Sequence, residues 1–234
     1  MSLPLRPPLV ELPGSISAVG FALDDYEAAV QAAAGFGFAG VPERAVLKRR
    51  AEFLAGRLAA VQALRALGVV EAPGRRDDGS PSWPAEAVGS ISHGAGRALC
   101  IAGKRSEFSS LGIDAERVLS PDASRELRAR ICTDREREVL AAALSLGDHE
   151  LVSLAFSSKE SLYKCLYPLV GRYMEFHAAE VVNARVRARA GALLGELTLE
   201  LRVDWSTSFR AGCRFAATFA ATAEHVETAV ALVA

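Results

Sequence analysis

Three carboxylates and their basic neighbours are the residues of this sequence whose types and spacing could support chemistry. The segment LGIDAERV contains Asp114 and Glu116, which stand two residues apart. In a continuous strand this spacing directs both side chains to the same face. Two carboxylates that lie so close raise each other's pKa, and a hard divalent cation such as Mg²⁺ relieves their repulsion. The alternative is a solvated strand end where Arg117 balances the charge.

A third carboxylate, Glu160, lies in the segment FSSKESLYK, within a helix expected from about 150 to 167 and ended by Pro168. Lys164 follows Glu160 by four residues, the spacing of a helix-surface ion pair worth roughly 0.2–0.5 kcal/mol. Phe156 shares this face, so the stripe is expected to be part-buried, and a glutamate there needs a better partner than solvent. Both a surface ion pair and a site residue therefore stay open for Glu160.

Basic side chains gather on another expected helix, which begins at Pro42 and stops at Gly68. Apolar residues recur every three or four positions along it. Arg49 lies within about a quarter-turn of Arg57, counting about 100° per residue. The two arginines could clamp a phosphate, because each offers bidentate donors and a permanent charge. The alternative is a solvated helix face with Glu52 as a neighbour.

Two further polar segments could contact an anion. Arg75 lies in the loop APGRRDDGSPSWP, and Ser92 and His93 end a short strand, AVGSIS, before a glycine-rich turn. Backbone amides at such a turn can bind an anion, with His93 as a further donor. A solvated loop arginine and a polar hairpin turn are the alternatives.

The elements that must position these residues alternate between helices and strands. Strands are expected around 15–21, at 87–92 and 97–103, up to LGID, and at 181–189, 195–205, 213–221 and 225–233, with a further helix within 122–146. This order predicts an α+β fold rather than repeated βαβ units. A boundary near 104–110 divides the chain into halves, 1–106 and 107–234, which each contain a helix and strands.

Composition limits the kinds of partner. The 234 residues include 27 Lys and Arg against 28 Asp and Glu, so no overall field attracts nucleic acid or a membrane. The four cysteines are far apart and form no CxxC pair, which argues against a zinc ribbon or a disulfide scaffold. Prolines interrupt the N-terminal segment, and no apolar run reaches membrane-spanning length. These features predict a cytoplasmic protein.

Taken together, the motifs resemble those of the larger, monomeric 4′-phosphopantetheinyl transferases, which serve polyketide, nonribosomal peptide and siderophore synthesis. The resemblance covers about residues 45–170 and is carried, in the family's order, by RRAEFLAGR, GSPSWP leading into VGSISHG, LGIDAE and FSSKESLYKCLYP. It implies two similar α+β halves in a pseudo-twofold arrangement, with coenzyme A in the cleft between them. It also implies transfer of 4′-phosphopantetheine from coenzyme A to a serine of an apo acyl or peptidyl carrier protein, with release of 3′,5′-ADP.

The resemblance also implies roles for individual residues. Asp114 and Glu116 would hold Mg²⁺ or Mn²⁺, and Glu160 would complete the metal site, accept the proton of the serine, or do both. Lys164, together with Lys159, would stabilise charge on the departing group. The residues implied to bind coenzyme A are Arg49, Arg57, Arg75, Ser92, His93, Asp114, Lys159 and Lys164. One departure is Phe156, which stands where many relatives have tryptophan.

Two other functions stay open at this point. A Mg²⁺-dependent phosphodiesterase or pyrophosphatase could also use clustered acids and arginines, although such hydrolases generally carry more acids and metal-site histidines. A non-catalytic module that binds coenzyme A would not need all three carboxylates.

Overall fold

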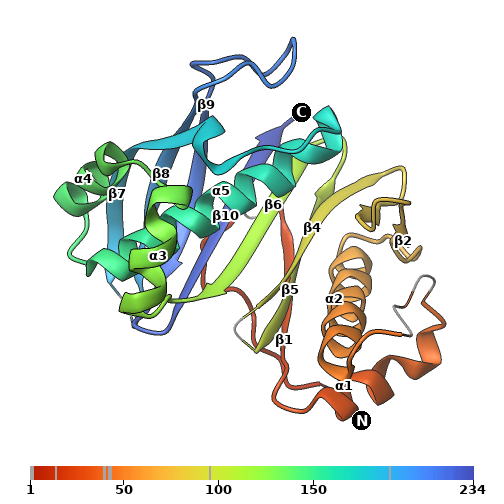
Figure 1. Cartoon of the computed structure of the whole chain (residues 1–234). Coiled ribbons are helices and arrows are strands. Elements are labelled where there is room, and N and C mark those ends of the chain that lie inside the picture. Colours follow the sequence, from red (N-terminus) through yellow and green to blue (C-terminus); the bar gives the residue numbers. More distant parts are fainter. Residues whose placement is uncertain (1–2, 14, 39–40, 42–43, 95, 190) are drawn as a thin grey trace. The chain divides into compact units, whose positions relative to one another are not determined.

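A computed structural model describes the chain from residue 3 to residue 234, except residues 14, 39–40, 42–43, 95 and 190 (Figure 1). The chain forms two compact units. Unit 1 comprises Met1–Pro8, Pro13–Leu111 and Leu232–Ala234, and unit 2 comprises Leu9–Leu12 and Gly112–Ala231. The boundary therefore lies within strand β6 (Phe108–Arg117), whereas the sequence places it between residues 106 and 107, because one continuous strand runs through both units.

Unit 1 is a three-stranded antiparallel sheet against which a long helix packs. The sheet has the order β1-β5-β4, formed by β1 (Ser17–Ala22), β4 (Ala87–Gly94) and β5 (Arg97–Lys104). Helix α2 (Leu47–Ala66) contacts all three strands, and α1 (Tyr26–Ala33), followed by the 3₁₀ turn η1 (Ala34–Phe36), packs against α2. A small ribbon precedes β4 and consists of β2 (Gly74–Arg75) and β3 (Pro81–Ser82).

Small residues let α2 lie close to the sheet. Five alanines and one glycine are among its buried residues, and a Cβ added to Gly56 would lie 2.8 Å from the Ile91 side chain of β4. The predicted stop is confirmed, since Gly68 follows the helix with φ +84, a conformation that glycine adopts readily. The predicted start at Pro42 lies outside the described residues.

Unit 2 is built on a five-stranded sheet of order β6-β10-β9-β8-β7. Its other strands are β7 (Ala179–Arg189), β8 (Leu193–Leu201), β9 (Arg214–Ala221) and β10 (His225–Val233), and these four pair antiparallel in chain order. Buried and half-buried residues alternate along the whole of β8, as the period-two pattern predicts. The long helix α5 (Asp148–Val170) lies across this sheet and contacts β7, β8 and β9 (Figure 1).

The helices of unit 2 differ in two ways from the prediction. The single helix expected within 122–146 is two helices, α3 (Pro121–Ile131) and α4 (Asp134–Ala143), because Cys132 is extended and Thr133 begins a new helix as its N-cap. The predicted end of α5 at Pro168 is wrong. A proline in the last turn removes only one backbone donor, and the helix continues to Gly171, whose φ of +68 ends it.

The predicted α+β class with two halves is confirmed, since each unit combines an antiparallel sheet with helices. The short elements α1, η1, η2 (Phe176–Ala178), β2 and β3 were not expected from the sequence. Among the described residues, no single helix has both the length and the apolar composition to cross a membrane. Helices α4 and α5 meet that criterion only as a pair, bent by 109°.

Candidate active site

Strand β6 presents the first two carboxylates of the candidate site. It runs without interruption from Phe108 to Arg117, so the condition for Asp114 and Glu116 to share a face is met. Asp114 is 1% exposed, and Glu116 is half-buried. Burial therefore makes both charges costly unless a cation lies near them.

A close backbone contact brings α5 against this strand. A Cβ added to Gly112 would lie 1.9 Å from the Ser161 carbonyl oxygen and 2.8 Å from the Cys165 nitrogen. Any larger residue at position 112 would therefore push the helix away. Glycine in the LGID segment thus permits the contact that brings the acids of β6 to the polar face of α5.

Helix α5 supplies a carboxylate and an ammonium group to the same place. Lys164 Nζ donates a hydrogen bond to Asp114 Oδ1 at 2.6 Å. Glu160, one turn earlier on the helix, is half-buried. Burial raises its pKa and the Asp114 carboxylate raises it further, while Lys164 acts in the opposite direction. The predicted helix-surface pair of Glu160 and Lys164 is thus part of a larger cluster that includes β6.

Glu116 shows the strongest effect of this clustering. Burial, the Asp114 carboxylate and, to a smaller extent, Glu160 raise its pKa to about 7, against the opposing effect of Lys164. A carboxyl group with such a pKa is one whose negative charge lacks sufficient compensation. Three acids against one ammonium leave an excess of negative charge at this place.

This donor set fits a hard divalent cation in its chemistry, because carboxylate oxygens are the ligands that Mg²⁺ prefers. The excess negative charge gives an independent reason for a cation to bind. The geometry of a metal site is not formed, however: within the described part of the chain no three His, Cys, Asp or Glu side chains converge closely enough to hold an ion. The contact seen at Asp114 is with Lys164 instead.

Among the predicted basic residues of unit 1, Arg57 on α2 is buried. Arg57 is 4% exposed, its guanidinium lies 5.1 Å from the centre of the Phe53 ring, and Nη1 has no hydrogen-bond partner among the described residues. Burial lowers the pKa of Arg57 to about 10, and the positive charge of Arg75 also lowers it. A buried guanidinium with an unused donor is a suitable partner for an anion.

The other predicted polar residues of unit 1 differ in their surroundings. Arg49 Nη1 lies 3.0 Å from His93 Nε2, so the structure brings these two together. Glu52 lies within 3.9 Å of His93 Nδ1 and within 3.8 Å of Arg49, and it balances part of their charge. Ser92 is buried in the paired part of β4 rather than exposed at a turn.

Arg75 lies on the exposed ribbon β2, where its side chain packs beside Gly79. The turn at Gly79 has φ +86, a conformation that favours glycine. Asp78 accepts hydrogen bonds from the backbone and the hydroxyl of Ser80, so it stabilises this turn. The loop predicted around Arg75 is therefore an ordered hairpin.

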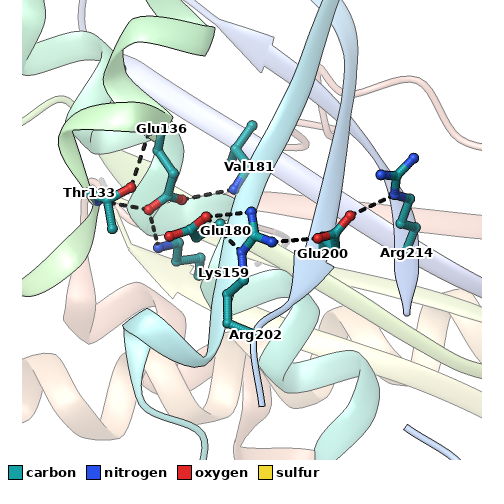
Figure 2. A network of polar contacts seen from close by, with 8 residues as sticks. All are labelled: Thr133, Glu136, Lys159, Glu180, Val181, Glu200, Arg202 and Arg214. Carbon is teal, nitrogen blue, oxygen red and sulfur yellow. Dashed lines mark hydrogen bonds and ion pairs between the residues drawn. The ribbon is translucent and has the colours of Figure 1, made fainter. Parts of the chain in front are cut away.

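Lys159 does not share the environment of Lys164. It is 1% exposed, and its Nζ donates to Glu136 Oε2 at 2.9 Å (Figure 2). The same atom also donates to the Ile131 carbonyl oxygen at 2.7 Å. The predicted contact with coenzyme A does not agree with this position, because the ammonium is held inside unit 2. To reach a ligand it would have to leave a fully buried glutamate unpaired.

Comparison with known proteins adds a separate line of evidence. The model of the 4′-phosphopantetheinyl transferase N-terminal domain matches residues 38–103, and the model of the 4′-phosphopantetheinyl transferase superfamily matches residues 110–220. Together the two matches cover most of both units. The chain belongs to the 4′-phosphopantetheinyl transferase superfamily. The resemblance inferred from the motifs is therefore confirmed.

Several curated relatives support this assignment. The chain is 45% identical to enterobactin synthase component D of Salmonella typhimurium over 117 residues, which are 50% of this chain and 48% of that protein. It is 41% identical to the 4′-phosphopantetheinyl transferase Svp of Streptomyces mobaraensis over 143 residues, 59% of this chain and 56% of Svp. For the 4′-phosphopantetheinyl transferase PptT of Mycobacterium tuberculosis, the identity is 36% over 59% of this chain and 60% of PptT. The matched part spans about half the length of these relatives.

Three residues that make the contacts described above were not singled out from the sequence. Gly112 and Phe53 act through close packing, which no local pattern reports. Glu136, in contrast, carries a readable signal: Thr133 and Glu136 have the spacing of a capping box, and both of its reciprocal hydrogen bonds are present.

Proposed function

We propose that this phosphopantetheinyl transferase moves the 4′-phosphopantetheine group of coenzyme A to a serine of an apo acyl or peptidyl carrier protein and releases 3′,5′-ADP. Membership of the family supports this activity, as do the names of Svp and PptT. The observation that carries the proposal is the contact between Lys164 and Asp114, with the charges of Glu116 and Glu160 close by. Transfer of a phosphoryl-type group requires such charged side chains around the reacting centre.

The basic residues of unit 1 would bind the phosphates of coenzyme A. Arg57 supports this role best, because its buried Nη1 has no acceptor within the part of the chain that the structure describes. Arg49 and His93 form a second group of donors. Arg75, whose charge acts on Arg57, and Ser92, which precedes His93, would also take part in phosphate binding.

Asp114, Glu116 and Glu160 would hold the metal, which we propose to be Mg²⁺, with Mn²⁺ as the other ion that suits oxygen ligands. The bound ion would polarise the pyrophosphate and neutralise part of its charge. The excess of carboxylates over cations supports this assignment. To bind one ion together, the acids would have to lie closer to one another than they do in this structure.

Glu160 is the candidate base, and Lys164 is the candidate cation that stabilises the leaving group. In the transfer the serine oxygen forms a bond to phosphorus, the pyrophosphate P–O bond breaks, and the serine proton passes to a base. The raised pKa of Glu160 makes its carboxylate a stronger base than an ordinary glutamate, which suits a proton acceptor. Lys164 would stabilise the negative charge that develops on 3′,5′-ADP.

The carrier proteins would belong to siderophore, nonribosomal peptide or polyketide synthesis, as in the type of transferase that the motifs resemble. We also propose that the protein acts as a monomer, like that type. A reducing compartment such as the cytoplasm suits its four cysteines, which are all free thiols.

Mass spectrometry of the carrier protein tests the proposal. The protein is incubated with coenzyme A, Mg²⁺ and an apo carrier protein, and the carrier is then weighed. A carrier with alanine at the acceptor serine and a reaction with EDTA serve as controls. We expect a phosphopantetheine adduct on the serine carrier alone and none after chelation.

The other outcomes would identify a different function. Breakdown of coenzyme A without modification of the carrier would indicate a phosphodiesterase. Binding of coenzyme A with neither reaction would indicate a non-catalytic module. An adduct that forms equally well in EDTA would exclude the metal part of the proposal.

A further inference from the structure

A buried ion pair ties four elements of unit 2 together behind the polar face of α5. Glu136, on α4, is 0% exposed, and Lys159, on α5, is 1% exposed. Glu136 Oε2 accepts hydrogen bonds from Lys159 Nζ and from the Thr133 backbone N–H, each at 2.9 Å, and Oε1 accepts one from Val181 N–H of β7 at 2.9 Å (Figure 2). The carboxylate thus joins α4, α5 and β7 at one point.

Lys159 completes the junction through its second hydrogen bond. Its Nζ donates at 2.7 Å to the carbonyl oxygen of Ile131, which is the last residue of α3. Both charges are therefore paired and also hydrogen-bonded to the backbone, which is the condition under which a buried ion pair is tolerated. The pair thus links α5 to α3, α4 and β7.

The helix places this junction next to the candidate catalytic groups but on another side. Successive residues of an α-helix are about 100° apart, so Lys159 and Glu160 point in different directions. Lys164, which shares the side of Glu160, donates to Asp114 of β6. A rotation or shift of α5 that displaced Lys159 would move Glu160 and Lys164 by a similar amount.

We propose that Lys159 is a positioning residue, which through Glu136 holds α5 in the position where Glu160 and Lys164 meet the carboxylates of β6. This inference rests on the proposed transfer activity for its catalytic part. It replaces the role in binding coenzyme A that the sequence indicated. Glu136 is then the main partner of the Lys159 charge, and a neutral pair that packs equally well should serve the same purpose.

A double-mutant cycle separates the two roles. Lys159→Met leaves a buried carboxylate without its cation, and Glu136→Gln leaves a buried ammonium without its anion. Each single change should increase the unfolding equilibrium constant by about a hundredfold or more. The double variant replaces both charges, so we expect it to be clearly more stable than the sum of the single changes predicts.

The unfolding of unit 2 can be followed separately. Trp205 is 3% exposed in unit 2, and the other tryptophan, Trp83, lies in unit 1. Urea unfolding is therefore measured by fluorescence of Trp205, with Trp83→Phe in every variant. Glu138→Gln, an exposed position on α4, and Lys104→Met, an exposed position in unit 1, serve as controls and should leave the midpoint unchanged.

Transfer kinetics give the readout that a merely structural role would not change. For the folded fraction of Lys159→Met, we expect kcat to fall at least about tenfold with little change in the KM for coenzyme A, because alignment rather than binding is lost. The double variant should recover most of kcat. If Lys159 contacts phosphate instead, KM rises in both variants and the second change restores nothing.

Two results would overturn the proposal: stability effects that simply add, or a double variant that regains stability but stays as inactive as Lys159→Met. Failure of the proposed activity is recognised separately, because the parent protein would then not modify a carrier protein at all. In that case the stability cycle alone still tests whether the pair holds α5 in place.

Discussion

Each unit contains a set of charges that the described side chains do not fully balance. In unit 1, the buried guanidinium of Arg57 has a donor without an acceptor among the described residues. In unit 2, Asp114, Glu116 and Glu160 gather around Lys164, and the pKa of Glu116 rises to about 7. Such arrangements cost folding free energy when the ligand is absent. The cost is offset when an anion binds to Arg57 and a cation binds to the carboxylates of unit 2.

Arg57 gives a prediction with opposite effects on binding and stability. Arg57→Met should weaken the binding of coenzyme A by roughly 1.5–3 kcal/mol, or about 10- to 150-fold in Kd, the scale of a charged hydrogen bond. The free energy of unfolding should not decrease, because the cost of burying the charge is removed. Calorimetry and urea unfolding measure the two quantities. Arg65→Met, an exposed change on the same helix, is the control. A less stable protein with unchanged affinity would contradict the assignment.

The three carboxylates should be separable by their effects on metal and turnover. Asp114→Asn and Glu116→Gln should keep the fold and lose most of the binding of Mg²⁺ and of the transfer rate. Glu160→Gln should lower kcat by about 10²–10⁴-fold, the usual contribution of a general base. Circular dichroism checks the fold, calorimetry the metal and mass spectrometry the transfer. Near-normal turnover in any variant would refute the role of that residue. Normal metal binding by Glu160→Gln would mean that Glu160 accepts the proton but does not bind the metal.

At the scale of elements, the candidate site depends on how closely one strand and one helix approach. The acids belong to β6, and Glu160 and Lys164 belong to α5, so neither element can form the cluster alone. Gly112 is the point of contact, because its missing side chain leaves room for the Ser161 carbonyl. A shift of the helix by the width of a methyl group would lengthen the hydrogen bond between Lys164 and Asp114 beyond its normal range.

Gly112→Ala tests this contact. The added Cβ would lie 1.9 Å from the Ser161 oxygen, so the helix must move. We expect the free energy of unfolding to fall by about 1–3 kcal/mol and the transfer rate to fall with it. Gly35→Ala is the matched control, since nothing lies within 4 Å of a Cβ at that position. Full activity in Gly112→Ala would show that the spacing of β6 and α5 is not critical.

At the scale of the whole molecule, the two compact units are not two consecutive pieces of chain. Leu9–Leu12, near the N-terminus, belongs to unit 2, although the residues on both sides of it belong to unit 1. Glu227 Oε2 accepts hydrogen bonds from the backbone N–H groups of Leu9 and Val10, at 2.5 Å and 3.3 Å. Thr218 Oγ1 donates to the Glu11 carbonyl oxygen at 2.8 Å. The start of the chain is thereby attached to β9 and β10.

Removal of the Glu227 carboxylate should release this N-terminal segment. Glu227→Leu leaves two backbone donors without this acceptor, so we expect the free energy of unfolding of unit 2 to fall by about 1–3 kcal/mol. Hydrogen exchange at the amides of Leu9 and Val10 should accelerate. Glu224→Gln, an exposed neighbour, is the control and should change neither quantity. Unchanged protection of both amides would mean that other contacts hold the segment.

Local patterns in the sequence predict much of this fold. The alternation within 195–205 and the glycine after α2 correctly indicate a strand and a helix end, because each depends on neighbours in the chain, although β8 covers Leu193–Leu201. Local patterns do not predict the features that depend on longer-range contacts. A proline in the last turn of α5 does not end that helix, and the short elements around α1 give too weak a signal to be recognised.

Residue types at given spacings are enough to predict the family, the α+β class and the set of acids and bases. Which charges face each other depends on how distant parts of the chain pack, and no local pattern predicts it. In FSSKESLYK two lysines flank one glutamate, and no local pattern distinguishes them. Lys164 lies beside Asp114, whereas Lys159 is buried against Glu136, 23 positions earlier in the chain. A pairing of this kind depends on how the helix is rotated against its neighbours, and that rotation is determined by packing rather than by the helix's own sequence.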